Sequence, residues 1–208
     1  MPPIKAPVKT LADFIPEGAY ELVLPYFNQY TIHLTLTKER ATILGNYKNP
    51  IHLQDPHLIS VNGNLNPYSF LITLLHEIAH LVTFVQYKHA VAPHGTEWKN
   101  NFKSILQPFI LQSIFPTDIA LAVMNYCNNV KASTCGDATL FKTLKKYDVT
   151  QTNTMFVEQL PLMSIFKIKD GTQFQIIEKR RTRYKCMQLD TKKIYLFPGI
   201  YEVYPVPE

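Results

Sequence analysis

The sequence predicts an α+β fold, with a larger helix-rich domain followed by a small all-β module. Up to about residue 146, segments with apolar residues at helical spacing lie before and after a group of short strands. From about Met155 onward, short β-type runs are separated by turn dipeptides such as Asp170-Gly171 and Pro198-Gly199. We therefore expect a first domain at residues 1–150 and a barrel-like β module at residues 151–208.

The first domain is expected to open with a helical segment at Leu11–Tyr30, with Pro16 as a boundary between a short and a longer helix. Residues 31–37 alternate between apolar and polar side chains, which predicts a half-buried strand. Further strand candidates lie at residues 41–47, 51–53 and 58–61. An edge strand of this sheet is where we expect an extended peptide backbone to dock.

Asn66 and Pro67 mark the start of the helix that carries the most informative residues. Asn is a preferred N-cap and Pro is favoured at the first helical position. The helix is expected to run to about Val85 and contains a His-Glu-x-x-His motif, formed by His76, Glu77 and His80. Residues four apart lie on one helix face, so the two imidazoles can bind one Zn²⁺ at roughly 2.0–2.1 Å.

His94 is the natural third ligand, fourteen residues after His80. A catalytic zinc has three protein ligands and one open position, and it lowers the pKa of bound water to about 7. Glu77 lies beside the metal and can accept a proton from that water as a general base. We expect one zinc ion. A structural zinc is disfavoured, because such sites are closed by four ligands and are rich in Cys.

Other polar residues near the motif allow more than one interpretation. His89, in the loop at residues 86–93, is either a transition-state donor or a solvated loop residue. Glu97 either orients a ligand imidazole or is an ordinary exposed helix residue. We expect Trp98 to anchor the turn at His94 in the core rather than to contact substrate. The remaining histidines, His33, His52 and His57, are expected to have no metal role.

The residues after His94 predict three more helices. Gly95-Thr96 opens the first, in which Trp98 and Phe102 recur at helical spacing and Pro108 is expected to interrupt the helix. The other two are expected at residues 117–130 and 137–146.

The composition indicates the cellular compartment in which the protein is expected. The 208 residues have a formal net charge of +5 and contain Cys127, Cys135 and Cys186, with no Cys-x-x-Cys pair. This odd count fits reduced thiols better than a disulfide framework. The N-terminus has no apolar signal-like region, and His76, Glu77 and His80 interrupt the most apolar segment. We expect a soluble, cytoplasmic protein without a membrane partner.

The β module contains a dense basic run, formed by Lys179, Arg180, Arg181, Arg183 and Lys185. In a strand, Arg181, Arg183 and Lys185 would share one face, with Tyr184 and Cys186 on the other. Near Phe174 and Tyr195, such a face could contact a nucleic-acid backbone. The other interpretation, a solvated charged face, is equally open.

The segments HEIAHLV at residues 76–82 and VAPHGTEWK at residues 91–99 resemble the SprT-like zinc metallopeptidases. This family includes bacterial SprT and the protease domain of Spartan. The resemblance covers roughly residues 10–110. It implies a zincin-like α+β domain in which His76, His80 and His94 bind Zn²⁺ and Glu77 is the general base. It also implies peptide-bond hydrolysis, in Spartan on proteins crosslinked to DNA.

The sequence departs from this family at its C-terminal side. Many members carry a zinc ribbon with two Cys pairs, which Cys127, Cys135 and Cys186 do not form, so no second zinc is expected. Any coupling to DNA therefore depends on the basic run alone. We expect a zinc-dependent endopeptidase that acts on a protein or peptide substrate, with DNA-associated proteins as one class. The alternative is a nucleic-acid-associated adaptor or regulatory protein with a vestigial or structural zinc site.

Overall fold

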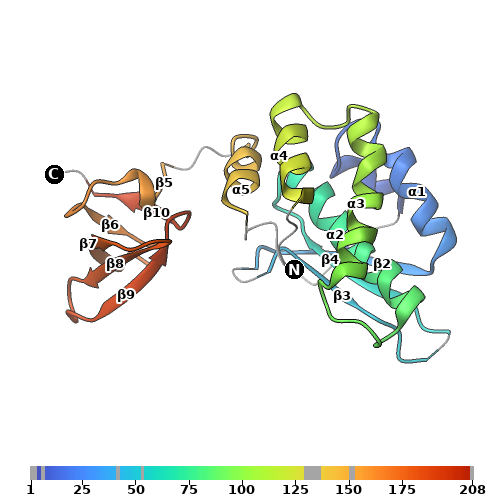
Figure 1. The fold of residues 1–208 in the computed structure, drawn as a ribbon, viewed down its shortest axis with the longest axis horizontal. Helices are drawn as coiled ribbons and strands as arrows, with labels where there is room; N and C mark the ends of the chain where they lie inside the picture. Colours follow the sequence, from blue (N-terminus) through green and yellow to red (C-terminus); the bar gives the residue numbers. More distant parts are fainter. Residues whose placement is uncertain are drawn as a thin grey trace. The chain divides into compact units, whose positions relative to one another are not determined.

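A computed structural model describes residues 4–5, 8–40, 43–52, 54–128, 137–149 and 153–206. The fold is α+β, as predicted, and it divides into two compact units, Met1–Asp148 and Val149–Glu208 (Figure 1). Each unit has its own sheet and its own hydrophobic core. We call them the N-terminal unit and the C-terminal unit and describe each by itself.

The sheet of the N-terminal unit has the strand order β1-β2-β4-β3. Its strands are β1 (Ile4–Lys5), β2 (Ile32–Thr37), β3 (Gly45–Lys48) and β4 (His57–Asn62). β2 and β4 are parallel, whereas β3 is antiparallel to β4 and lies at the edge of the sheet. Leu34, Ile59 and Val61 are buried on the face that meets the helices, and His33 is exposed on the other face.

Two strand predictions in this sheet need correction. The strand expected at residues 41–47 begins at Gly45, and residues 41 and 42 lie outside the described part of the chain. The strand expected at residues 51–53 is not formed at Ile51 and His52, while residue 53 is not described. Here the backbone N–H of His52 donates to the Asp55 carboxylate (2.9 Å), which closes a turn between two prolines instead.

The expected helical segment before the sheet is present as two pieces on either side of Pro16. These are the 3₁₀ helix η1 (Val8–Asp13) and α1 (Ala19–Gln29), and α1 includes Pro25. Leu11, Ile15, Ala19 and Val23 face the core. The segment therefore packs against the core of the N-terminal unit.

α2 (Pro67–Tyr87) is the central helix of the N-terminal unit. It packs on β3 and β4 on one side and on α3 (Thr96–Leu111) on the other (Figure 1). By length and composition alone, α2 could span a membrane, despite its His-Glu-x-x-His motif. However, 67% of its most apolar window is buried inside the protein, and the core helix of a soluble protein passes the same test.

The prediction that Pro108 interrupts its helix is wrong. α3 continues to Leu111, and the N–H of Gln112 still donates to the carbonyl oxygen of Pro108 (3.0 Å). The proline removes one helical hydrogen bond, but it lies in the last turns, where buried Leu106 and Phe109 keep the helix on the core. The next helices are α4 (Thr117–Asn128) and α5 (Ala138–Lys145), the latter capped by the Asp137 carboxylate.

The C-terminal unit is a sheet with the strand order β5-β10-β6-β7-β8-β9, and neighbouring strands are antiparallel. Its core contains Phe166, Phe174, Ile176, Cys186 and Val203. β5 and β9 are the two ends of the order, so within the described residues the sheet is open. The strands are β5 (Met155–Phe156), β6 (Ile165–Lys167), β7 (Gln173–Lys179), β8 (Arg183–Gln188), β9 (Ile194–Pro198) and β10 (Glu202–Pro205).

Candidate metal centre

The imidazoles of His76, His80 and His94 converge on one point. Their Nε2 atoms are 3.1 Å apart for His76 and His94, 3.2 Å for His76 and His80, and 2.9 Å for His80 and His94. Ligands of a tetrahedral zinc at 2.0–2.1 Å would be about 3.3 Å apart. The three nitrogens therefore match the triangular base of a four-coordinate site, and they could hold a metal ion.

The surroundings keep these imidazoles in the neutral form that a metal ligand needs. Burial lowers the pKa of His76 to about 3, and the neighbouring His80 and His94 add to the effect. Burial also lowers the pKa of His80 to about 4 and, to a smaller extent, the pKa of His94. Neutral imidazoles present a lone pair to a cation without first losing a proton.

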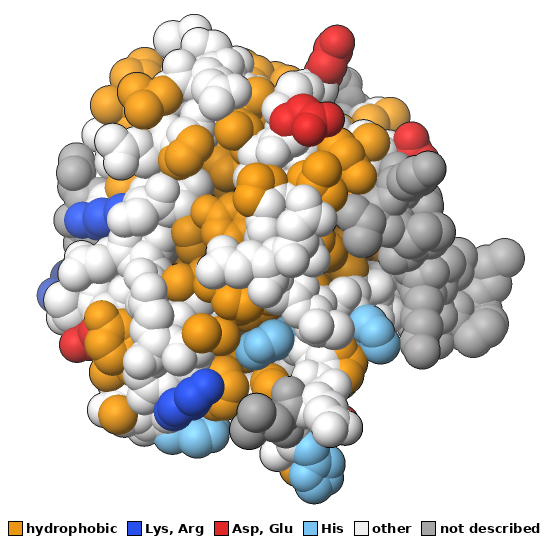
Figure 2. Space-filling model, turned by 90° about the vertical axis from the view of Figure 1, so that its right-hand side faces the viewer, with side chains coloured by type: hydrophobic (Ala, Val, Ile, Leu, Met, Phe, Trp, Pro, Cys, Tyr) orange, Lys and Arg blue, Asp and Glu red, His pale blue; other side chains and the backbone are white. Residues whose placement is uncertain are grey.

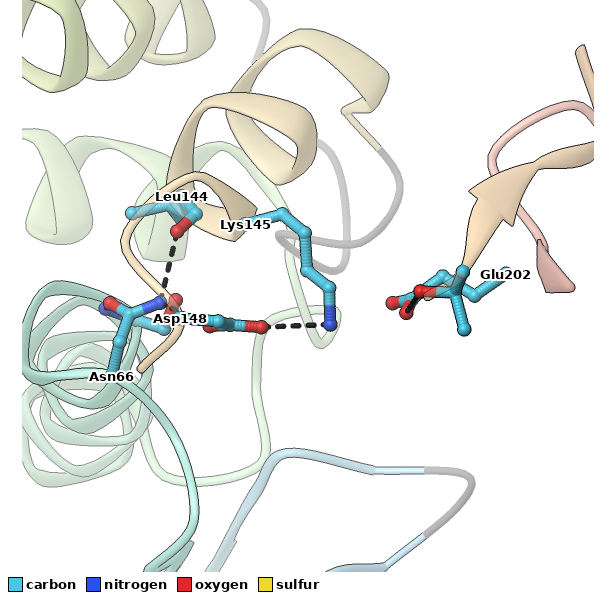
Figure 3. A network of polar contacts seen from close by, with 7 residues as sticks. Asn66, Leu144, Lys145, Asp148 and Glu202 are labelled. Atoms are coloured by element: carbon cyan, nitrogen blue, oxygen red, sulfur yellow. Dashed lines mark hydrogen bonds and ion pairs between the residues drawn. The ribbon is translucent and has the colours of Figure 1, made fainter. Parts of the chain in front are cut away.

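The start of α2 is fixed by Asn66 in three ways. Its side-chain oxygen accepts the N–H of Ser69 (2.9 Å) as the N-cap. Its amide donates to the carbonyl oxygen of Leu144 (2.9 Å) and to the carboxylate of Asp148 (2.7 Å), at the end of α5 (Figure 3). Lys145 pairs with the other oxygen of Asp148 (2.8 Å). This network sets where α2 begins and so where its two histidines lie.

His94 reaches the centre from the loop between α2 and α3. Its backbone has a φ of 59°, a left-handed conformation in which histidine is several-fold over-represented among non-glycine residues. Gly95 follows, and a Cβ at this position would come within 2.9 Å of the carbonyl oxygen of Ala92. The tight turn before Thr96 thus needs glycine and aims the third imidazole at the other two.

Trp98 packs against all three imidazoles. Its ring centroid is 4.6 Å from that of His76, 4.6 Å from that of His94 and 5.2 Å from that of His80. The side chain is 1% exposed and stacks on Phe102 at 5.1 Å. Trp98 is therefore a wall of the centre and part of the core, not a surface for substrate.

Glu77 lies next to His76 on α2 and is buried against β3. A Cβ on Gly45 would come within 2.6 Å of the Glu77 carboxyl oxygen, so the close approach of β3 depends on glycine. Burial raises the pKa of Glu77 to about 8, while the Arg40 guanidinium and the backbone N–H of Tyr47 act in the opposite direction. The carboxyl group is therefore suited to exchange a proton near neutral pH.

Arg40 and Asn62 hold the chain that leads into β3. Arg40 donates to the side chains of Asn62 (2.8 Å) and Ser60 (3.0 Å) and to the carbonyl oxygen of Leu44 (3.3 Å). Asn62 is buried and donates to the carbonyl oxygens of Arg40 and Ile43. Sequence patterns do not reveal this network, because Asn62 and Ser60 are far from Arg40 in the chain.

Tyr47 and His57 form a second pair that sequence reasoning did not assign to the site. The Tyr47 hydroxyl lies 2.9 Å from Nδ1 of His57. The Tyr47 ring is nearly parallel to that of His80, with an angle of 2° and a centroid distance of 6.4 Å. Tyr30 and Phe84 pack edge-on against His57. These aromatic residues hold β3 and β4 beside the metal centre.

Comparison with known proteins agrees with this geometry. Residues 25–119 match the model of the SprT-like family. We call this matched part of the chain the SprT-like domain. The family is associated with zinc metallopeptidases. No curated protein and no solved structure matches the chain at a significant level. The match ends within α4, so the C-terminal unit lies outside it.

Other predicted site residues of the SprT-like domain lie farther from the three nitrogens. His89 is exposed, with its ring 5.3 Å from that of Phe84. Glu97 is half-buried beside Gly95, and among the described residues it has no hydrogen bond to a ligand imidazole. His33 and His52, which were not predicted as site residues, are exposed. Figure 2 shows histidine side chains gathered toward the lower end of one face, with most of the visible acidic side chains toward the upper end.

The structure separates the basic run of the C-terminal unit into different environments. Arg183 and Lys185 are on β8, opposite buried Tyr184 and Cys186, but Arg181 lies in the bend between β7 and β8 rather than in a strand. The other two basic residues have partners. Lys179 lies over the Tyr184 ring, and Arg180 pairs with Glu178 (3.8 Å). The expected common face therefore contains two basic residues of the run instead of three.

Proposed function

We propose that the SprT-like domain is a zinc-dependent endopeptidase. The supporting observation is the convergence of three imidazole nitrogens, 2.9–3.2 Å apart. The buried carboxyl group of Glu77 lies on α2, the helix that also carries His76 and His80. A structural zinc would need a fourth protein ligand, and among the described residues no further His, Cys, Asp or Glu joins this group. We propose likewise that this domain has a zincin-like fold.

His76, His80 and His94 would hold one Zn²⁺ through their Nε2 atoms. When bound, this ion supplies a Lewis acid that polarises a peptide carbonyl and acidifies water. The Glu77 carboxylate accepts a proton from the attacking water and then donates it to the leaving amine. Gly45 and the backbone N–H of Tyr47 keep that carboxylate in place from the side of β3.

β3 is the edge strand nearest to this carboxyl group, which supports a protein or peptide substrate. Within the described residues its outer edge pairs with no other strand. An extended peptide that pairs with this edge would run past the metal centre, because Gly45 and Tyr47 of the strand contact Glu77 and His80. The strand would then recognise the main chain of the substrate, so binding would not require a particular substrate sequence.

Substitution of the proposed general base and of one proposed metal ligand tests this proposal. Glu77→Gln keeps the size of the side chain, so we expect cleavage of a protein substrate to be lost while zinc content is retained. His94→Ala should lower both zinc content and cleavage. The assay uses a DNA-binding protein as substrate, with and without single-stranded DNA. Retained cleavage by Glu77→Gln would contradict the role of the carboxylate.

The alternative of a nucleic-acid-associated adaptor has less structural support. Of the three aromatic residues near the basic run, Phe174 and Tyr184 are buried in the core, which leaves only Tyr195 to stack on a base. An adaptor would bind DNA in a salt-sensitive manner, weakened by Arg181 and Arg183 substitution, and would show no cleavage. We also propose a cytoplasmic location, consistent with Cys127 and Cys186 as free thiols.

A further inference from the structure

β9 is an edge strand without the features that normally protect such an edge. Its five residues, Ile194 to Pro198, include no charged side chain. Ile194, Tyr195 and Leu196 are 51%, 42% and 45% exposed. Folded proteins usually protect a sheet edge with charges, bulges or a covering segment, because unpaired backbone groups attract another strand. Here the proline comes only at the end of the strand, and no other strand of the described residues pairs with the outer edge.

The neighbouring strand β8 places positive charge beside these apolar side chains. Lys185 is paired with Leu196, and Arg183 is paired with Pro198, so each pair lies on one face of the sheet. Among the described residues, Arg183 and Lys185 form no ion pair, and Glu178, which lies opposite Lys185 in the register of β7 and β8, pairs with Arg180. The face therefore combines an aliphatic row at the edge with a basic row one strand inside it.

We propose that β9 binds an extended acidic peptide segment of a partner protein as an added strand. The partner's backbone would pair with the open edge of β9, and its aliphatic side chains would cover Ile194 and Leu196. An added strand would lie about 10 Å from β8, two strand spacings away. The long side chains of Arg183 and Lys185 span this gap toward glutamate or aspartate carboxylates, which sets the preference for acidic partners.

Nucleic acid and a second copy of the chain fit this surface less well. The side chains exposed beside the two cations are mainly aliphatic, and base stacking needs open aromatic faces. A second copy would bring the same cations to the contact instead of carboxylates. An acidic peptide satisfies the backbone edge, the aliphatic row and the basic row together.

The proposal is tested on the full chain with synthetic peptides and does not depend on the metal centre. The probe is a fluorescently labelled peptide that alternates glutamate with valine, and binding is followed by fluorescence anisotropy. Two matched peptides alternate lysine with valine, or carry proline at the central valine. We expect both to bind at least about tenfold more weakly than the acidic peptide, because one removes charge complementarity and the other removes backbone pairing.

Variants locate the binding surface. The double variant Arg183→Glu and Lys185→Glu should weaken binding of the acidic peptide by at least about tenfold, and Leu196→Lys should weaken it several-fold. Lys167→Glu is the control, since β6 lies two strands away from β8 in the same sheet. It should change affinity by less than about twofold. Circular dichroism confirms that each variant is folded.

Three results would overturn the proposal. The first is equal binding of the acidic and lysine peptides, or no measurable binding of either. The second is tighter binding of an oligothymidylate than of the acidic peptide, lost in the same double variant, which would assign the face to nucleic acid. The third is a concentration-dependent dimer, abolished by Leu196→Lys, which would assign β9 to a second copy.

Discussion

The Tyr47 hydroxyl is 2.9 Å from Nδ1 of His57, and the two rings stack at a centroid distance of 5.9 Å. This contact joins the edge strand β3 to β4 at the point where Tyr47 lies parallel to His80. Burial, followed by the charge of Lys88, lowers the pKa of His57. The folded protein therefore favours a neutral His57, so protonation of this residue at acid pH should lower the stability of the fold.

The sign of this pH dependence follows from the lowered pKa. In the unfolded chain His57 takes up a proton near pH 6.5, whereas in the folded protein it does so only at lower pH. Stability should therefore fall as the pH drops below about 6.5. His57→Asn keeps a polar atom near the Nδ1 position but cannot titrate, so its denaturation midpoint should depend less on pH between about 5 and 7. Parallel curves for both proteins would contradict this role.

Gly45 leaves no room for a side chain between β3 and α2. In Gly45→Ala the new Cβ would lie 2.6 Å from Glu77 Oε1 and 2.7 Å from Thr73 Cγ2, so β3 or the helix must shift. We expect a loss of about 1–3 kcal/mol in the free energy of unfolding, together with a loss of cleavage. Urea denaturation and the protein-cleavage assay measure the two effects.

Gly63→Ala is the matched control for this substitution. Its added Cβ would lie 3.6 Å from the nearest atom, the carbonyl oxygen of Thr37, which is an ordinary contact. It should leave cleavage unchanged. Equal effects of the two substitutions would show that the close approach at Glu77 has no special importance.

The predictable features of this site were those formed by residues that are close together in the sequence. Asn66-Pro67 marked the start of α2 correctly, because a cap and its helix are neighbours in the chain. The histidine spacing indicated a metal site, since i and i+4 share a helix face wherever the helix packs. His94 needed one further step, a turn at Gly95, which the resemblance to a known family supported.

The parts contributed by distant residues were not predictable. Gly45 lies in a segment predicted as a strand, and its close approach to Glu77 becomes visible only when β3 is placed against α2. For His57 the sequence predicted only that it has no metal role, because the tyrosine it contacts is on another strand. Pro108 failed as a helix end because burial of Phe109 outweighed the local cost of the proline.

Asn66 links the start of α2 to the end of α5, so its replacement should cost more than an ordinary cap. Asn66→Ala removes the cap, worth about 0.5–2 kcal/mol, and also leaves the Leu144 carbonyl oxygen without its donor. Asn66→Asp keeps a good N-cap acceptor but sets a carboxylate against Asp148, 2.7 Å from the present amide. We expect both variants to be destabilised in urea denaturation.

A second substitution separates the two functions of Asn66. Adding Asp148→Asn to Asn66→Asp replaces one of the two facing carboxylates with an amide, so part of the lost stability should return. The ion pair of Asp148 with Lys145 is partly exposed and contributes at most about 1 kcal/mol. If Asn66→Asp is as stable as the wild type at neutral pH, the contacts of the Asn66 amide with the end of α5 do not contribute to the stability of the fold.

Trp98 offers a direct optical test of the metal centre, because it is the only tryptophan and its ring touches all three imidazoles. Co²⁺ has d–d absorption that can quench a nearby indole, whereas Zn²⁺ is d¹⁰ and lacks it. Titration with Co²⁺ should therefore quench Trp98 emission to saturation, and Zn²⁺ should restore it by competition. His94→Ala should shift the Co²⁺ midpoint by at least about tenfold, while Glu77→Gln and His33→Ala, an exposed control, should not. An unchanged midpoint in His94→Ala would mean that the three nitrogens do not bind the metal together.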